Sequence, residues 1–287
     1  MAIILVVPTT WIFGIIAESR RIEQIHQLGG FVYYEQAQNT WLTDPLMMHS
    51  TGDIYAIHFD DCSDINHRHL TLIHHFREVE SLSFMRSGIT DEDLESLSTL
   101  PNVRSLNLVG TEISDSGIGH FSRHSALELA GLNGTNCTDA CLVELSKCRD
   151  LKALGLESTS VTDNGIRTLR DMKNLSELNI QGTRVTDAGV EILVELRLRS
   201  LNLGGEEITD ESLNHIEQMH NLEELWVVSH RISEDGINEF CPGDKLETIN
   251  LLLPNVPSKA MDRLQQRVEA SVVNHNHLIR GQEPRSE

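Results

Sequence analysis

The stretch Leu151–Asp163, LKALGLESTSVTD, contains the pattern that decides the fold. Its apolar skeleton, L-x-x-L-x-L followed by G-T-x-[IV]-[TS]-D, recurs along the chain with departures in individual copies. Successive starts are 24 residues apart, except for one interval of 23 before Leu198. Self-similarity at a fixed period of this length predicts a solenoid in which each copy forms one coil. The copies begin at Val79, Val103, Leu127, Leu151, Leu175, Leu198, Leu222 and Leu246, and a weaker copy around Ile57 and Phe59 precedes them.

Each copy contains a short strand followed by a short helix. In the run LNL at 106–108 the apolar residues alternate with period two, as in a strand. Leu94, Leu97 and Leu100 recur every three residues, which is typical of a short helix with one buried stripe. One coil cannot bury these faces alone, so the coils must stack. We therefore predict an α/β horseshoe solenoid with a parallel sheet on the concave side and helices on the convex side.

Two polar columns follow the strands. Thr111, Thr135, Thr159 and Thr183 form the first, and we expect their hydroxyls to bond the backbone of the adjacent coil. The second is a hydroxyl residue followed by aspartate, just before each helix. We interpret these pairs as helix N-caps rather than as a metal-binding or catalytic row. They are Thr90-Asp91, Ser114-Asp115, Thr138-Asp139, Thr162-Asp163, Thr186-Asp187 and Thr209-Asp210.

Between Ile54 and Leu264 the pattern resembles the cysteine-containing class of leucine-rich repeats, known from F-box substrate receptors and from many bacterial proteins. Cys137 replaces the Ile or Val of the turn, and Cys148 takes a helix position held by Leu or Met in other copies. No F-box precedes the repeats, so the match is to the bacterial membrane-anchored variant. The resemblance implies a repeat fold and a protein-binding role.

The composition restricts the partners. The chain has 23 Lys and Arg against 43 Asp and Glu, a formal net charge of −20. Such an acidic body repels nucleic acid and favours basic partners. The five cysteines include no C-x-x-C pair and no disulfide framework spacing, and the redox compartment stays open.

Residues 1–17 are predicted to be an N-terminal transmembrane anchor, which makes the protein a single-pass membrane protein of open orientation. The run Ala2–Ala17 is uncharged and mostly apolar. Its 16 residues fall short of the ~20 that cross a bilayer. A cleaved signal peptide lacks the preceding basic residues, and a buried helix lacks the expected polar face, but both stay open as alternatives.

Residues 18–53 are predicted to form a juxtamembrane helix and an N-terminal cap. Ile22, Ile25 and Leu28 share one helical stripe, and a strand at 31–34 follows. The run RRIEQIHQLGGFVYY is similar to the segment after the anchor in bacterial leucine-rich repeat proteins, and by that resemblance it caps the first coil. Trp41, Leu42 and Leu46 are expected to help cover it.

The repeats occupy 54–257. A C-terminal cap helix is predicted at 258–273, with Met261 and Leu264 facing inward, and a disordered tail at 274–287.

The residues flanking the buried leucines of each strand face the concave side and make up the candidate partner-binding surface. Its N-terminal half carries small residues, whereas Trp226, toward the C-terminal end, is the one large aromatic of these columns from Ser81 to Leu252. An aromatic anchor ringed by polar groups is typical of interface hot spots. The alternative is that the asparagines are spacers and Trp226 covers apolar surface near a cap. The predicted site residues are Glu177, Asn179, Asn202, Glu224, Trp226 and Asn250.

We predict no catalytic residue, no cofactor and no metal. The chain lacks the G-x-S-x-G, P-loop, H-E-x-x-H and G-x-G-x-x-G motifs. His67, His69, His74 and His75 cluster around one helix without the ligand spacing that zinc requires. The preferred hypothesis is a non-enzymatic, membrane-anchored module that binds a protein or peptide on its concave face, with a basic ligand as one option. The alternatives are a substrate receptor of a ubiquitin-ligase-like complex and a structural envelope protein, and the oligomeric state is open.

Overall fold

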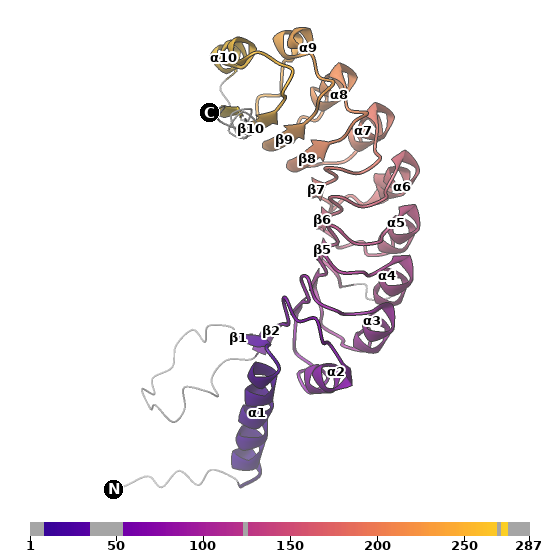
Figure 1. Ribbon diagram of the computed structural model, residues 1–287, viewed down its shortest axis with the longest axis vertical. Coiled ribbons are helices and arrows are strands. Elements are labelled where there is room, and N and C mark those ends of the chain that lie inside the picture. The colour runs from indigo at the N-terminus through magenta and orange to yellow at the C-terminus, as the bar shows by residue number, and fades with distance from the viewer. Residues whose placement is uncertain (1–8, 35–53, 123–125, 269–270, 275–287) are drawn as a thin grey trace, which may run out of the picture.

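A computed structural model of the chain describes residues 9–34, 54–122, 126–268 and 271–274. The coils follow one another along an arc, with the strands on its inner side and the helices on its outer side (Figure 1). The predicted α/β solenoid, with a parallel concave sheet and convex helices, is therefore confirmed.

The sheet has eleven strands in chain order, and all neighbours are parallel except the antiparallel first pair. The described strands are β1 (Phe31–Tyr34), β2 (Ile54–His58), β3 (Ser81–Ser83), β4 (Ser105–Asn107), β5 (Leu129–Gly131), β6 (Ala153–Gly155), β7 (Glu177–Asn179), β8 (Ser200–Gly204), β9 (Glu224–Val228), β10 (Thr248–Leu252) and β11 (Ser271–Asn274).

A helix follows most strands. The described helices are α1 (Thr9–Gln27), α2 (His67–Ile73), α3 (Asp91–Leu97), α4 (Asp115–Phe121), α5 (Asp139–Leu145), α6 (Asp163–Thr168) with the 3₁₀ turn η1 (Leu169–Asp171), α7 (Asp187–Leu193), α8 (Asp210–Ile216), α9 (Glu234–Glu239) and α10 (Ser258–Arg267).

One buried residue from each repeat strand builds the core column under the sheet. These residues pair in succession from strand to strand, so each leucine packs on its counterpart in the next coil. The 23-residue interval shortens the loop between α7 and β8, while Leu178 still pairs with Leu201. The column is Leu82, Leu106, Ala130, Leu154, Leu178, Leu201, Leu225 and Ile249.

The threonine column bonds differently from the prediction. The hydroxyl of Thr135 donates to the carbonyl of Leu132, three residues earlier in its own coil, at 2.7 Å. Thr111, Thr159 and Thr183 repeat this bond at 2.6–2.8 Å. The expected bond to the adjacent coil is therefore wrong, because the tight turn brings the residue's own strand carbonyl within reach of its hydroxyl.

The N-caps are confirmed, and their aspartates form the ladder between coils. Thr162 caps α6 by accepting from the amide of Asn164 at 3.2 Å. Asp163, the next residue, accepts from both the amide and the hydroxyl of Thr186 in the following coil, each at 2.8 Å. The same two hydrogen bonds, one from the amide and one from the hydroxyl, join Asp91 to Ser114, Asp115 to Thr138, Asp139 to Thr162, Asp187 to Thr209 and Asp210 to Ser233.

The N-terminal helix is longer than expected. α1 starts at Thr9, so the predicted boundary between residues 17 and 18 falls inside it. It ends at a glycine turn, where Gly29 has φ of +85° and the amide of Gly30 donates to the carbonyl of Ile25. Among the residues described, no helix combines the length and apolar character needed to cross a bilayer. Trp41, Leu42 and Leu46 lie outside the described residues.

The C-terminal cap helix is shorter than predicted. α10 ends at Arg267, and residues 271–274 form β11, parallel to β10, so the helix predicted to reach residue 273 is wrong beyond that point. The guanidinium of Arg267 donates to the carbonyls of Ile237 and Asn238 in the preceding coil. Leu264 is the last buried residue of α10, and Val268 has extended backbone angles that turn the chain back toward the sheet. Of the predicted disordered tail, Asn274 belongs to β11, and 275–287 lie outside the described residues.

Candidate binding surface on the concave sheet

The six predicted site residues lie in two columns on four neighbouring strands. Asn179 pairs with Asn202, which pairs with Trp226, which pairs with Asn250. Glu177 and Glu224 lie in the other column, on either side of Ser200. Both glutamates are exposed, and the other four side chains are half-buried.

A hollow of about 400 Å³ on the concave sheet divides this predicted set. It contains Glu177, Asn179 and Asn202, whereas Glu224, Trp226 and Asn250 lie outside it, toward the C-terminal end. The other lining residues come from β4 to β8: Ser105, Leu106, Asn107, Leu129, Ala130, Gly131, Ala153, Leu154, Gly155, Leu178 and Ser200.

Small residues in the middle strands produce the hollow. Gly131, Ala153 and Gly155 occupy concave columns in which other coils carry larger side chains. Leu129 lies beside them and is 44% exposed, which leaves an apolar side chain at the hollow's wall. The small residues are visible in the sequence, but they form a hollow only when several coils are stacked, so one coil taken alone does not predict it.

A second group of aromatic side chains extends the surface at its N-terminal end. β1 pairs with β2 so that Phe31 lies opposite His58, and His58 shares its column with Ser83. Residues directly opposite in an antiparallel pair share a face, so Phe31 and Tyr33 face the concave side. The ring centroids of Tyr33 and His58 are 4.6 Å apart, and Phe31 is 62% exposed. Partial burial lowers the pKa of His58, and the nearby Asp60 carboxylate partly opposes this shift.

Several asparagine side chains on the concave face form hydrogen bonds within the protein, close to the ends of the strands. Asn179 donates to the Glu157 carboxylate at 3.1 Å and accepts from the amide of Gln181 at 3.1 Å. Asn133 accepts from the amide of Glu157 at 2.9 Å. Asn179 therefore fixes the Glu157 carboxylate at the rim as well as lining the hollow.

Lysine and arginine side chains along one edge of the sheet form ion pairs with glutamates of the same edge. In the column just before the strands, Glu128 accepts from Arg104 at 2.8 Å and from Lys152 at 2.5 Å. Those two bonds, the Lys152 bond first, lower the pKa of Glu128. Arg199 pairs in the same way with Glu223 at 2.6 Å. None of the concave column residues is Lys or Arg, so the columns themselves carry only negative charge, from the glutamates at 157, 177 and 224. Arg199, in the column just before the strands, interacts with Glu177 and Glu224 as well as with Glu223.

Among the residues that the structure describes, no group of potential metal ligands gathers on this surface. In the predicted histidine cluster, His69 is buried against Phe59 and accepts from the amide of Asn66, while His74 contacts Ser96. Within the described part of the chain, one group of side chains has the proximity that a metal site needs. It consists of Asp115, Cys137 and Cys141, and it lies in the core between α4 and α5.

One strand and one short helix per coil, stacked on a parallel sheet, define a leucine-rich repeat solenoid. The family model described as "Leucine Rich repeat" matches residues 99–121 and 171–194. The cysteine-containing subclass stays a prediction.

Two internalins of Listeria monocytogenes are similar in structure. The crystal structure of internalin C2 has 21% sequence identity and a TM-score of 0.49, over 61% of this chain and 73% of that chain. The internalin inlF has 18% identity and a TM-score of 0.53, over 74% of this chain and 57% of its own. At such identities the likeness of the second structure supports the fold alone. No curated protein matches the sequence significantly.

Proposed function

We propose that the concave sheet binds a basic segment of another protein, without catalysing a reaction. The observation that carries this proposal is the hollow over β4 to β8, where the Leu129 side chain is exposed beside carboxylates and amides. The column residues themselves include no cation, and Arg199, which lies near Glu177, is already paired with Glu223. A lysine or arginine side chain that also buries its methylene stem on Leu129 fits both properties.

The hollow favours an extended ligand. Five strands at a spacing of about 4.8 Å span roughly 19 Å, which is the length of about six residues of extended chain. Phe31 and Tyr33 at one end, and Trp226 at the other, offer aromatic contacts to a segment that extends beyond the hollow. The hollow's lining includes no His, Cys or Lys, which supports binding rather than catalysis.

Charge reversal at the surface tests this function. In a display library of short unstructured peptides, we expect the intact protein to enrich sequences that combine Lys or Arg with an apolar residue. Glu177→Lys together with Glu224→Lys should weaken the selected peptide at least about tenfold, because each reversal replaces an attraction by a repulsion. Isothermal titration calorimetry at two salt concentrations measures the affinity and its electrostatic part.

A control carries the same kind of charge reversal, at a single position, on the other side of the solenoid. Glu191 is exposed on α7, so Glu191→Lys should leave the affinity within about twofold. Enrichment of acidic or uncharged peptides, or equal losses in both variants, would contradict a basic ligand on the concave face.

Membrane attachment through residues 1–17 also stays a proposal. The apolar run Ala2–Ala17 supports it, although residues 1–8 lie outside the described part of the chain. We expect the full chain to remain in the membrane fraction after a carbonate wash, and a chain that begins at Glu18 to be released. Release of both forms would rule out an anchor in this segment.

A further inference from the structure

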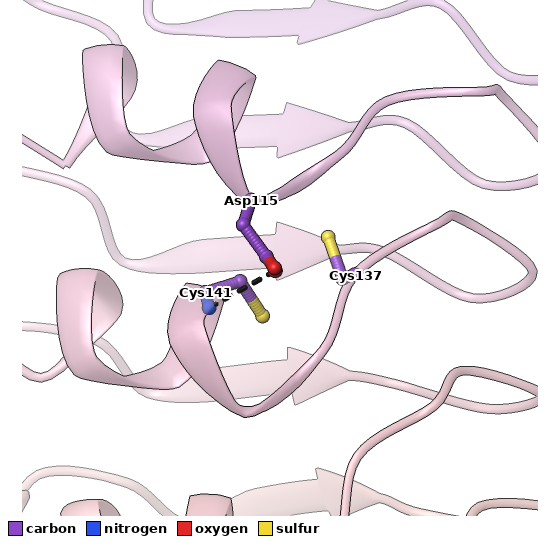
Figure 2. Close-up of side chains that lie close together, drawn as sticks. All are labelled: Asp115, Cys137 and Cys141. Carbon is purple, nitrogen blue, oxygen red and sulfur yellow. Dashed lines mark hydrogen bonds between the residues drawn. The ribbon is translucent and has the colours of Figure 1, made fainter.

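Two buried thiols and one carboxylate meet in the core of the fifth strand's coil. Asp115 is the first residue of α4, Cys137 lies on the loop that enters α5, and Cys141 is in the first turn of α5. Figure 2 shows these side chains converging between two successive coils. Their ligand atoms all lie within 4.8 Å of one another, and both cysteines are 0% exposed.

The other coils show what this position holds when only packing is required. Five of them have the same aspartate, but in these coils the column of Cys137 carries Ile or Val, and the column of Cys141 carries Gly or Ser. Both cysteines therefore replace the usual residues of their columns, and both replacements occur in the same coil. The counterparts are Ile113 and Gly117, Val161 and Gly165, Val185 and Gly189, Ile208 and Ser212, and Ile232 and Gly236.

The Asp115 carboxylate keeps its place in the ladder and still has capacity to spare. One oxygen accepts from the amides of Thr138 at 2.8 Å and Cys141 at 3.1 Å, and the other accepts from the Thr138 hydroxyl at 2.7 Å. A carboxylate offers about four acceptor positions, so the three bonds leave one on the second oxygen. The carboxylate therefore has one acceptor position beyond its ladder bonds.

We propose that Asp115, Cys137 and Cys141 bind a zinc ion. Some point lies within about 2.8 Å of all three ligand atoms if none is farther than 4.8 Å from the others, which is about 0.5 Å beyond an ideal Zn–S bond. Small side-chain rotations close this difference. Two thiolates and a carboxylate are ligands that zinc favours, and a water completes the tetrahedron. The ion offsets the charge of the two thiolates, so the site keeps the single negative charge that Asp115 already carries.

Binding must release protons and accompany folding. Zinc binds cysteine as the thiolate, so binding replaces the thiol protons and the affinity increases as the pH rises. Since both cysteines are fully buried, we expect the ion to enter as the coil closes during folding.

Refolding the full chain with Co²⁺ under reducing, anaerobic conditions tests the site. We expect one ion per chain, with the intense visible bands of tetrahedral cobalt thiolate, and displacement of Co²⁺ by Zn²⁺. Cys137→Val and Cys141→Gly should each abolish these bands. Both replacements are residues that other coils carry at the same columns, so the fold should persist, as circular dichroism can verify.

Cys148→Ala is the matched control, because Cys148 is equally buried but separate from the cluster. It should keep the cobalt spectrum, and zinc should raise its unfolding temperature as in the unsubstituted chain. A folded chain that takes up no Co²⁺ or Zn²⁺, or uptake that survives in both Cys137→Val and Cys141→Gly, would overturn the proposal.

Discussion

Ala153→Trp should reduce the affinity for the selected basic peptide at least about 100-fold, a loss of about 2.7 kcal/mol. Ala153 lines the hollow on the middle strand, between Leu129 and Glu177 in the same column. We expect an indole at this position to fill part of the 400 Å³ hollow and to cover the exposed side chain of Leu129. Because residue 153 faces the concave side, the core column beneath it should remain intact.

Calorimetric titration gives the affinity, and thermal unfolding confirms that the variant is folded. Ser160→Trp adds the same side chain at an exposed position in the same coil and should not change binding. Trp226→Ala should have a smaller effect, about tenfold, because Trp226 lies outside the hollow. Full affinity in Ala153→Trp would show that the peptide does not bind in the hollow, and the residues around Trp226 would then be the centre of the binding site.

The architecture could be predicted because the same physical requirement recurs in every coil. A strand that buries Leu154 must present Ala153 and Gly155 to the other side, and this alternation alone identifies the concave columns. Repetition also averages out local departures, such as the short interval before Leu198.

Features that occur once in the chain, or that depend on distance, could not be predicted in the same way. The pairing of Phe31 with His58 depends on the register of one antiparallel strand, for which the repeat offers no template. The hollow depends on side chains from five strands together, so its extent appears only when the coils are stacked. β11 replaces the last part of the expected helix because the end of the sheet offers a strand to pair with.

For the polar columns too, the sequence predicted the type of residue at each position but not its hydrogen-bond partner. The sequence identifies Thr162 and Asp163 as an N-cap pair, and Thr162 does cap its helix. It does not show that the aspartate points out of its own coil, because the choice of partner depends on how closely the next coil stacks. The link between coils therefore belongs to the aspartates rather than to the Thr159 column.

Asp163→Ala should destabilise the protein by about 3 kcal/mol. It removes two bonds of 2.8 Å to Thr186, and each hydrogen bond to a charged group contributes about 1.5–3 kcal/mol. It also leaves the amide of Thr186 without this acceptor and opens space against Gly189. Stability in a solenoid is carried by contacts between neighbouring coils, so we expect the loss to uncouple the two halves of the array. Urea unfolding monitored by circular dichroism should show a lower midpoint and a broader transition.

Asp163→Asn separates the geometry of this link from its charge. The remaining amide oxygen can still accept from the Thr186 amide, and the Thr186 hydroxyl can rotate to accept from the new NH₂ group, so the loss should be only about 1 kcal/mol. Asp171→Ala removes an exposed aspartate near the end of the same coil and should cost less than about 0.5 kcal/mol. Equal losses in Asp163→Ala and Asp171→Ala would show that net charge, rather than the bonds to Thr186, governs the stability of the array. The ranking Ala, then Asn, then the exposed control follows only if each coil is held to the next by the aspartate ladder.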